Sequence, residues 1–80
     1  MTVLAVFKSR SETLGYISLL RGVGVVASAV STPKEAGVGC GISARFEDGF
    51  LPRAKAVLAR GNYRSFAGFF KKTNFGFTYL

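Results

Sequence analysis

The chain has 80 residues, 49% of them apolar, and eleven Lys and Arg against four Asp and Glu give it a net charge of +7. A chain of this length forms one domain with a small core, and no apolar run approaches the roughly 20 residues that span a bilayer. One cysteine and no histidine exclude an internal disulfide, a conventional zinc site and a His-dependent nucleophile. We therefore expect a single domain over 1–80, without metal or cofactor, in the reducing cytoplasm. The excess positive charge favours anionic partners.

The first predicted element is a strand over 3–7, because these residues are apolar and partly β-branched. Ser9 followed by Glu12 matches a capping box, so a helix is expected to begin after Ser9 and to run to about Arg21. The side chains at helical spacing that would face the sheet are Thr13, Tyr16, Ile17 and Leu20.

Two further strands are predicted over 25–31 and 41–47, and a long glycine-rich loop joins them. Pro52 suits the first turn of a second helix, which Gly61 would end. A fourth strand is predicted over 65–70. Its alternation would place Phe66, Gly68 and Phe70 on one face and Ala67 and Phe69 on the other. Residues 71–80 would form a C-terminal tail or an extension of that strand.

The predicted order of elements, βαββαβ, defines the expected fold. Right-handed crossovers turn it into an α+β, ferredoxin-like sandwich with a four-stranded antiparallel sheet in the order 4-1-3-2 and two helices on one face. The second face of this sheet would be open and would expose Phe69 and its neighbours. We therefore expect a homo-oligomer formed through that face.

The glycine-rich loop holds the single cysteine, Cys40, between Gly39 and Gly41. The predicted topology brings this loop to the start of the first helix, and a helix N-terminus and nearby cations stabilise a thiolate. We therefore expect a reactive Cys40 thiol of lowered pKa. Gly39 and Gly41 would give access to it, and the residues expected to stabilise the anion are Lys8, Ser9, Arg10 and Lys34. The alternative is a small buried side chain, the common state of a lone cysteine.

Nucleic-acid binding and catalysis find less support in the sequence. A four-stranded sheet with aromatic side chains can stack RNA bases, but the strand over 41–47 does not carry the expected pattern of a basic residue, then glycine, then spaced aromatics. Glu47 and Asp48 are adjacent and are expected far from Cys40, so paired catalytic carboxylates are not supported. These features favour a non-catalytic carrier or binding protein over an enzyme.

The segment Ser31-Thr32-Pro33-Lys34, followed by Gly39-Cys40-Gly41 and a strand that ends in Arg45-Phe46, resembles the Se/S carrier protein-like family. That family carries a Pro-Thr-Pro-Arg/Lys segment, a Cys-Gly and a strand ending in Arg-Phe. Ser31 replaces its first proline, and Gly37-Val38-Gly39 replaces a serine-rich run. The resemblance, over roughly residues 3–70, implies that Cys40 holds sulfur or selenium as a persulfide or perselenide, exchanged with donor and acceptor proteins. The alternative is a non-enzymatic, dimerising interaction module with a structural Cys40.

Overall fold

The computed structural model describes the whole chain except Val38, a member of the glycine-rich loop, and the side chain of Glu35. Its elements are β1 (Thr2–Phe7), α1 (Arg10–Gly22), β2 (Ser28–Ser31), the short 3₁₀ helix η1 (Lys34–Ala36), β3 (Ile42–Glu47), the short 3₁₀ helix η2 (Asp48–Phe50), α2 (Leu51–Arg60), β4 (Phe66–Thr73) and β5 (Gly76–Tyr79). No helix in the described part of the chain is long and apolar enough to cross a bilayer.

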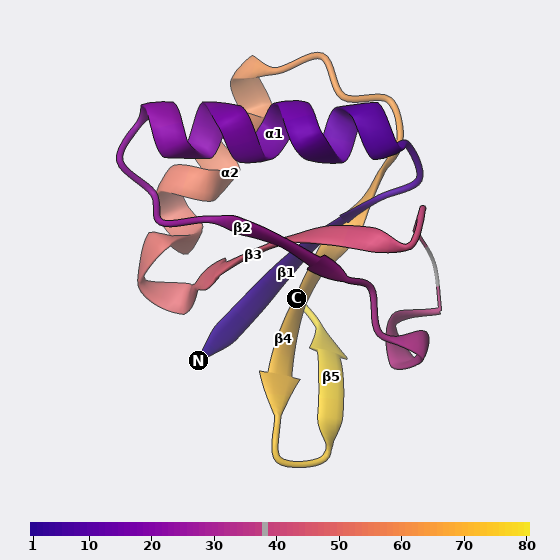
Figure 1. Ribbon diagram of the computed structural model, residues 1–80. Helices are drawn as coiled ribbons and strands as arrows, with labels where there is room; N and C mark the ends of the chain where they lie inside the picture. The colour runs from indigo at the N-terminus through magenta and orange to yellow at the C-terminus, as the bar shows by residue number, and fades with distance from the viewer. Residues whose placement is uncertain (38) are drawn as a thin grey trace.

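The strands of the described residues form one antiparallel sheet of five, in the order β2-β3-β1-β4-β5, with α1 and α2 packed on one face (Figure 1). The sheet therefore has one strand more than the four that the sequence predicted. The additional strand comes from residues 71–80, where β4 continues to Thr73 and a tight turn returns the chain as β5. The Thr73 hydroxyl closes this turn, because it accepts the Phe75 N–H at 3.2 Å and donates to the Gly76 carbonyl at 3.2 Å.

The first helix begins at the residue that the sequence predicted. The Ser9 side chain accepts the Glu12 N–H at 3.3 Å, which satisfies one of the free amides of the first turn. The four side chains expected to face the sheet are buried, namely Thr13, Tyr16, Ile17 and Leu20. The capping box is only half formed, because the N–H of Ser9 donates to the hydroxyl of Ser65, at the entry to β4, at 3.1 Å.

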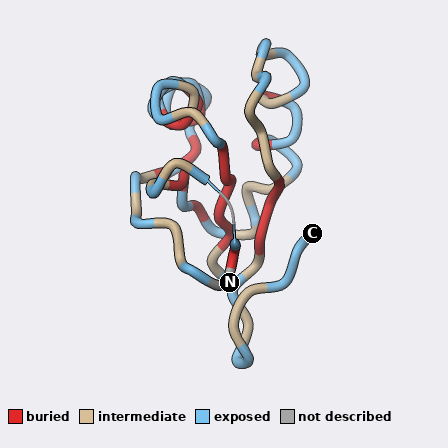
Figure 2. The backbone as a smooth tube through the Cα atoms, turned by 90° about the vertical axis from the view of Figure 1, so that its right-hand side faces the viewer, coloured by how far each residue is buried: buried red, intermediate tan, exposed pale blue. Residues whose placement is uncertain are grey.

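The main core lies between the helices and the sheet, and the buried stretch in Figure 2 follows the central strands. The ring of Phe7, at the end of β1, lies 5.1 to 5.3 Å from the rings of Tyr16, Tyr63 and Phe66, measured between centroids. Tyr16 is fully buried, and its hydroxyl donates to the carbonyl of Ala54 in α2 at 2.7 Å. Burial raises the pKa of Tyr16, so this hydroxyl stays protonated and joins α1 to α2.

Strand β4 does not alternate as the sequence predicted. Val6 pairs with Gly68 and Phe7 pairs with Phe66, so one residue between these two positions of β4 has no partner on β1. This bulge turns Phe66 and Phe69 to the same face, with ring centroids 4.9 Å apart. The prediction that Phe69 is exposed on an open face is therefore wrong, because the bulge buries it under the helices at 6% exposure.

The face of the sheet opposite the helices is covered from within the chain. Leu4, Val6 and Phe70 are buried there together with Ala36 of η1, and Phe77 of β5 packs against them. The ring of Tyr79 adds to this cover, with its centroid 5.1 Å from that of Phe70. The expected homo-oligomer was argued from an open apolar face, and this cover removes that argument. The oligomeric state itself stays a prediction.

The bond between the Tyr16 hydroxyl and the Ala54 carbonyl gives a test of the α1–α2 contact. Tyr16→Phe leaves the ring in place but removes the donor, so the free energy of unfolding should fall by about 1 kcal/mol in a denaturant titration. Tyr63→Phe is the control, because Tyr63 belongs to the same aromatic cluster but is half-buried; its effect should stay below about 0.5 kcal/mol. Equal losses in the two variants would contradict the role given to the Tyr16 hydroxyl.

Candidate functional site

Cys40 lies where β1 ends and α1 begins. Its N–H donates to the carbonyl of Phe7, the last residue of β1, at 3.1 Å. On the other side of the loop, the N–H of Thr32 donates to the carbonyl of Gly41 at 2.9 Å. The side chains of Thr32 and Ser43 add a hydrogen bond of 2.6 Å between their hydroxyls. The first of these bonds ties the loop to the central strand β1, and the other two join the two sides of the loop where β2 ends and β3 begins.

The glycines beside Cys40 were expected to give access to the thiol, and they also allow the backbone conformation of the loop. Gly39 has a φ of +114°, and a Cβ at this position would lie 2.8 Å from Cγ1 of Val6 and 3.5 Å from the carbonyl oxygen of Phe7. Gly39 therefore lets the loop approach β1 closely enough for the Cys40 N–H to reach Phe7. Gly41 also has a positive φ, +96°, but no atom of the described chain lies within 4 Å of the position that its Cβ would occupy.

The Cys40 thiol is half-buried and has polar neighbours. Its Sγ lies 3.6 Å from the hydroxyl oxygen of Thr13, in the first turn of α1, and the thiol donates to the carbonyl of Ile42 at 3.6 Å. The Thr13 hydroxyl also lies 3.0 Å from the carbonyl oxygen of Ser9, so its single hydrogen can go to that oxygen while the thiol is protonated and to Sγ once Cys40 is ionised. Cys40 is therefore neither fully exposed nor packed as a buried apolar side chain.

The surroundings of the Cys40 thiol lower its pKa. Desolvation acts to raise the pKa of Cys40, but hydrogen bonding to the sulfur by the backbone N–H groups of Ile42 and Cys40 and by the Thr13 hydroxyl outweighs it, and the charge of Arg10 adds to them. The net result is that the pKa of Cys40 lies below its ordinary value. This agrees in direction with the shift expected from the sequence, although hydrogen bonds contribute more than charge.

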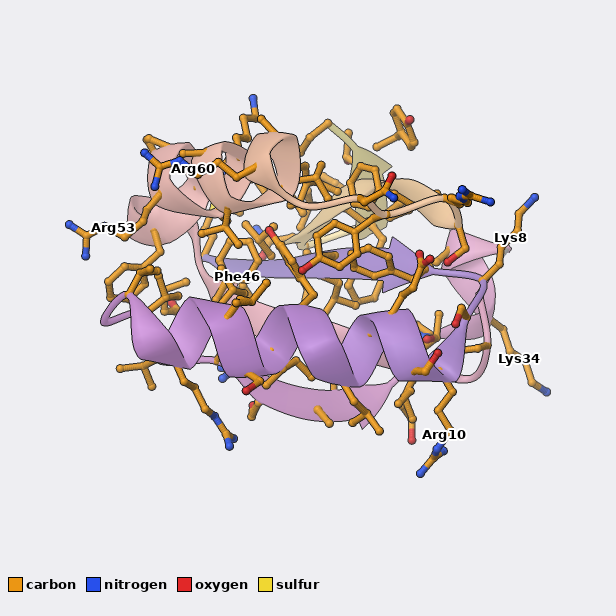
Figure 3. All side chains as sticks on the ribbon, turned by 90° about the horizontal axis from the view of Figure 1, so that it is seen from above. Lys8, Arg10, Lys34, Phe46, Arg53 and Arg60 are labelled. Carbon is orange, nitrogen blue, oxygen red and sulfur yellow. The ribbon has the colours of Figure 1, made fainter. Side chains whose placement is uncertain are left out.

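The residues expected to stabilise the anion share one end of the molecule but differ in what they do. Lys8, Arg10 and Lys34 reach outward around that end (Figure 3), and Arg10 is the one whose charge acts on the Cys40 thiol. Ser9 is engaged as the N-cap of α1. Thr13 was not expected at the site, because its place on the inward helix face identified it only as a core residue. The sequence signal for a role at the site was its hydroxyl in the first turn of the helix, where it can form a hydrogen bond with a neighbouring group.

Glu12 has a structural role that the capping-box interpretation missed. Its carboxylate accepts the hydroxyl and the N–H of Ser65 at 2.7 and 3.0 Å, and the N–H of Arg64 at 3.2 Å. The hydrogen bonds from Ser65 lower the pKa of Glu12, so the carboxylate stays charged at neutral pH. Glu12 thereby ties the start of α1 to the segment that enters β4, next to the end of β1.

A shallow hollow of about 350 Å³ lies beside the glycine-rich loop. The described residues that line it are Thr32, Pro33, Lys34, Gly37, Gly39 and Gly41. Cys40 is not one of them, so the thiol and this hollow are separate features. Within the described residues, no group of three or more His, Cys, Asp or Glu side chains is arranged to hold a metal ion.

This α+β domain thus holds one half-buried cysteine in a loop that is hydrogen-bonded to the end of its central strand. The family model described as "Putative Se/S carrier protein-like" matches residues 2–67, and the chain belongs to this family. Comparisons with curated proteins and with solved structures gave no match. The matched region includes Phe7, Thr13 and Cys40 and ends within β4, before the turn into β5.

The close approach of the loop to β1 can be tested with two matched glycine substitutions. Gly41→Ala should cost about 1 kcal/mol of unfolding free energy, because alanine disfavours a positive φ. Gly39→Ala adds a clash with Val6 and should cost a further 1–3 kcal/mol, on the order of other overpacking substitutions. Thermal and denaturant unfolding would measure both. Equal costs would show that the loop does not need the space beside Val6.

The lowered pKa of Cys40 can be measured from the rate of alkylation by iodoacetamide against pH. Because its surroundings lower the pKa of Cys40, the midpoint of the folded chain should lie below that of the same chain unfolded in urea. The same shift makes the thiolate stabilise the folded state above the unfolded pKa, and this stabilisation is lost as pH falls through the folded pKa. Thr13→Val removes one hydrogen bond and should raise the midpoint, while Lys55→Gln on α2 should leave it unchanged. A midpoint in the folded chain equal to or above that of the unfolded chain would refute the shift.

Proposed function

We propose that Cys40 carries a single sulfur or selenium atom as a persulfide or perselenide and passes it between a donor and an acceptor protein. Family membership supports the class of activity, because the family is described as carrier-like. The observation that carries the proposal is the position of the Cys40 sulfur, 3.6 Å from the Thr13 hydroxyl in the first turn of α1. A carrier needs a thiolate that is reachable and stabilised, and the partial exposure and lowered pKa of Cys40 support this role.

The chemistry of loading requires no further catalytic group on this chain. The Cys40 thiolate attacks the outer sulfur of a donor persulfide, its bond to that sulfur forms as the donor S–S bond breaks, and the donor leaves as a thiolate. Delivery is the same exchange with an acceptor thiolate. The Thr13 hydroxyl and the charge of Arg10 stabilise the negative sulfur before the transfer. A carrier of this kind fits a chain without histidine better than a hydrolase does.

The finer parts of the assignment belong to the same proposal. We assign the domain to the ferredoxin-like class, with β5 as an addition at the edge of β4. A cytoplasmic location follows from the need to keep the Cys40 thiol reduced between transfers. The dimerising module with a purely structural Cys40 is the alternative function. It draws on the exposed Phe75 and Tyr79 of the last hairpin, which lie apart from the thiol.

Mass spectrometry after incubation with a cysteine desulfurase and cysteine tests the proposal directly. The expected product is the intact chain plus one sulfur atom, localised to the peptide that contains Cys40 and removed by a reducing agent. Cys40→Ser is the control and should gain nothing while keeping its unfolding midpoint. An unmodified Cys40 thiol under conditions in which another carrier is loaded would favour the interaction module.

A further inference from the structure

Three cations surround the end of the molecule at which Cys40 lies. Lys8 follows β1, Arg10 begins α1 and Lys34 begins η1, and all three side chains are exposed. Figure 3 shows them reaching outward from one end, opposite to that of Arg53 and Arg60. Lys8, Arg10 and Lys34 are here called the basic rim.

The ion pairs of the described residues lie at the other end of the sheet. They join Glu47 and Asp48 to the amino group of Met1, to Arg45 and to Lys71, where β1 begins and β3 ends. The acidic side chain in the first turn of α1 is that of Glu12, which is engaged by Ser65 and Arg64. Among the described carboxylates, none forms an ion pair with the basic rim. The basic rim therefore places three exposed positive charges at the end of the molecule where Cys40 lies.

The surroundings of the basic rim fit an acidic protein better than a nucleic acid. Single-stranded RNA is held by exposed aromatic side chains on which bases stack, in addition to cations. The sheet face that could offer such a platform is covered by η1 and β5. The fully exposed Phe75 lies at the tip of the β4–β5 turn, beyond the far end of β1 from Cys40. The basic rim thus offers charge without an adjoining stacking surface in the described structure.

We propose that the basic rim docks an acidic protein surface, and that this surface belongs to the partner that exchanges sulfur or selenium with Cys40. The inference rests on the proposed carrier function and names the chemistry of its partner. Charges around a reactive atom raise the rate of productive encounters with an oppositely charged partner, and salt weakens this effect. Lys8 and Lys34 serve this steering, whereas Arg10 also acts on the thiol itself.

Disulfide exchange with two synthetic peptides measures the steering without a persulfide. Each peptide carries one cysteine as a mixed disulfide with a coloured aromatic thiol, flanked by glutamates in one peptide and by glutamines in the other. The Cys40 thiolate attacks the peptide sulfur, the two form a new disulfide, and the coloured thiolate is released and counted. The glutamate peptide should react about tenfold faster at low salt, and the ratio should approach one near 1 M salt.

Matched charge reversals locate the effect. The double variant Lys8→Glu and Lys34→Glu should abolish the preference for the glutamate peptide. Lys55→Glu with Lys72→Glu changes the net charge equally, at exposed positions on α2 and at the far end of β4, and should keep most of the preference. Equal losses in the two double variants would overturn the proposal, because net charge alone would then explain the rates. The proposal would also be overturned if a single-stranded RNA of equal charge bound more tightly than the glutamate peptide and only the Lys8→Glu and Lys34→Glu variant lost that binding, because the basic rim would then bind nucleic acid.

The outcomes separate this inference from the proposed function. Peptide exchange reports on docking near Cys40 whether or not a persulfide ever forms there. If the chain takes up no sulfur from a desulfurase but reacts faster with the glutamate peptide, and this preference depends on the basic rim, the carrier function is refuted and the acidic partner is supported. If the chain takes up sulfur but reacts equally fast with the two peptides, the carrier function is supported and docking of an acidic partner on the basic rim is refuted.

Discussion

The hydrogen bond from the Cys40 N–H to the Phe7 carbonyl is the contact on which the arrangement of the site depends. Phe7 ends β1, which lies between β3 and β4 and is buried on both faces from Val3 onward. The strand cannot shift without disturbing both cores, so its last carbonyl is a rigid point in the molecule. The loop bound to that point places a sulfur atom beside the first turn of α1. The buried strand β1 thereby sets the position of the described part of the glycine-rich loop.

The sequence was informative wherever a local signal decides the structure. The cap at Ser9, the inward face of α1 and the meeting of Cys40 with the start of that helix all follow from short-range patterns and chain order. It was misleading where pairing between distant segments decides. The bulge in β4 depends on how Phe66 and Gly68 register against β1, and a single glycine in a strand gives only a weak hint of it. Phe69 was assigned to the wrong face for that reason.

The cover of the second sheet face could not have been predicted for a related reason. It is assembled from η1 and β5, which are far apart in the chain and come into contact only in the folded structure. Neither Ala36 nor Phe77 is recognisable alone as a core residue. The site shows the same limit, because the hydroxyl of Thr13 matters through its distance to a sulfur atom that follows it by 27 positions. Composition identified the cysteine and the cations, while the hydrogen bonds that polarise the thiol required coordinates.

The solitary state of Cys40 has a further consequence for its oxidation chemistry. A sulfenic acid formed by peroxide is normally rescued when a neighbouring thiol condenses with it to a disulfide. This chain supplies no second thiol, and the contacts of Cys40 with Thr13 and Ile42 are to oxygen atoms. A disulfide that protects Cys40 against irreversible overoxidation to sulfinic acid must therefore form with a thiol of another molecule, such as glutathione. Because Cys40 is half-buried, its accessibility limits the rate at which that second thiol can react with it.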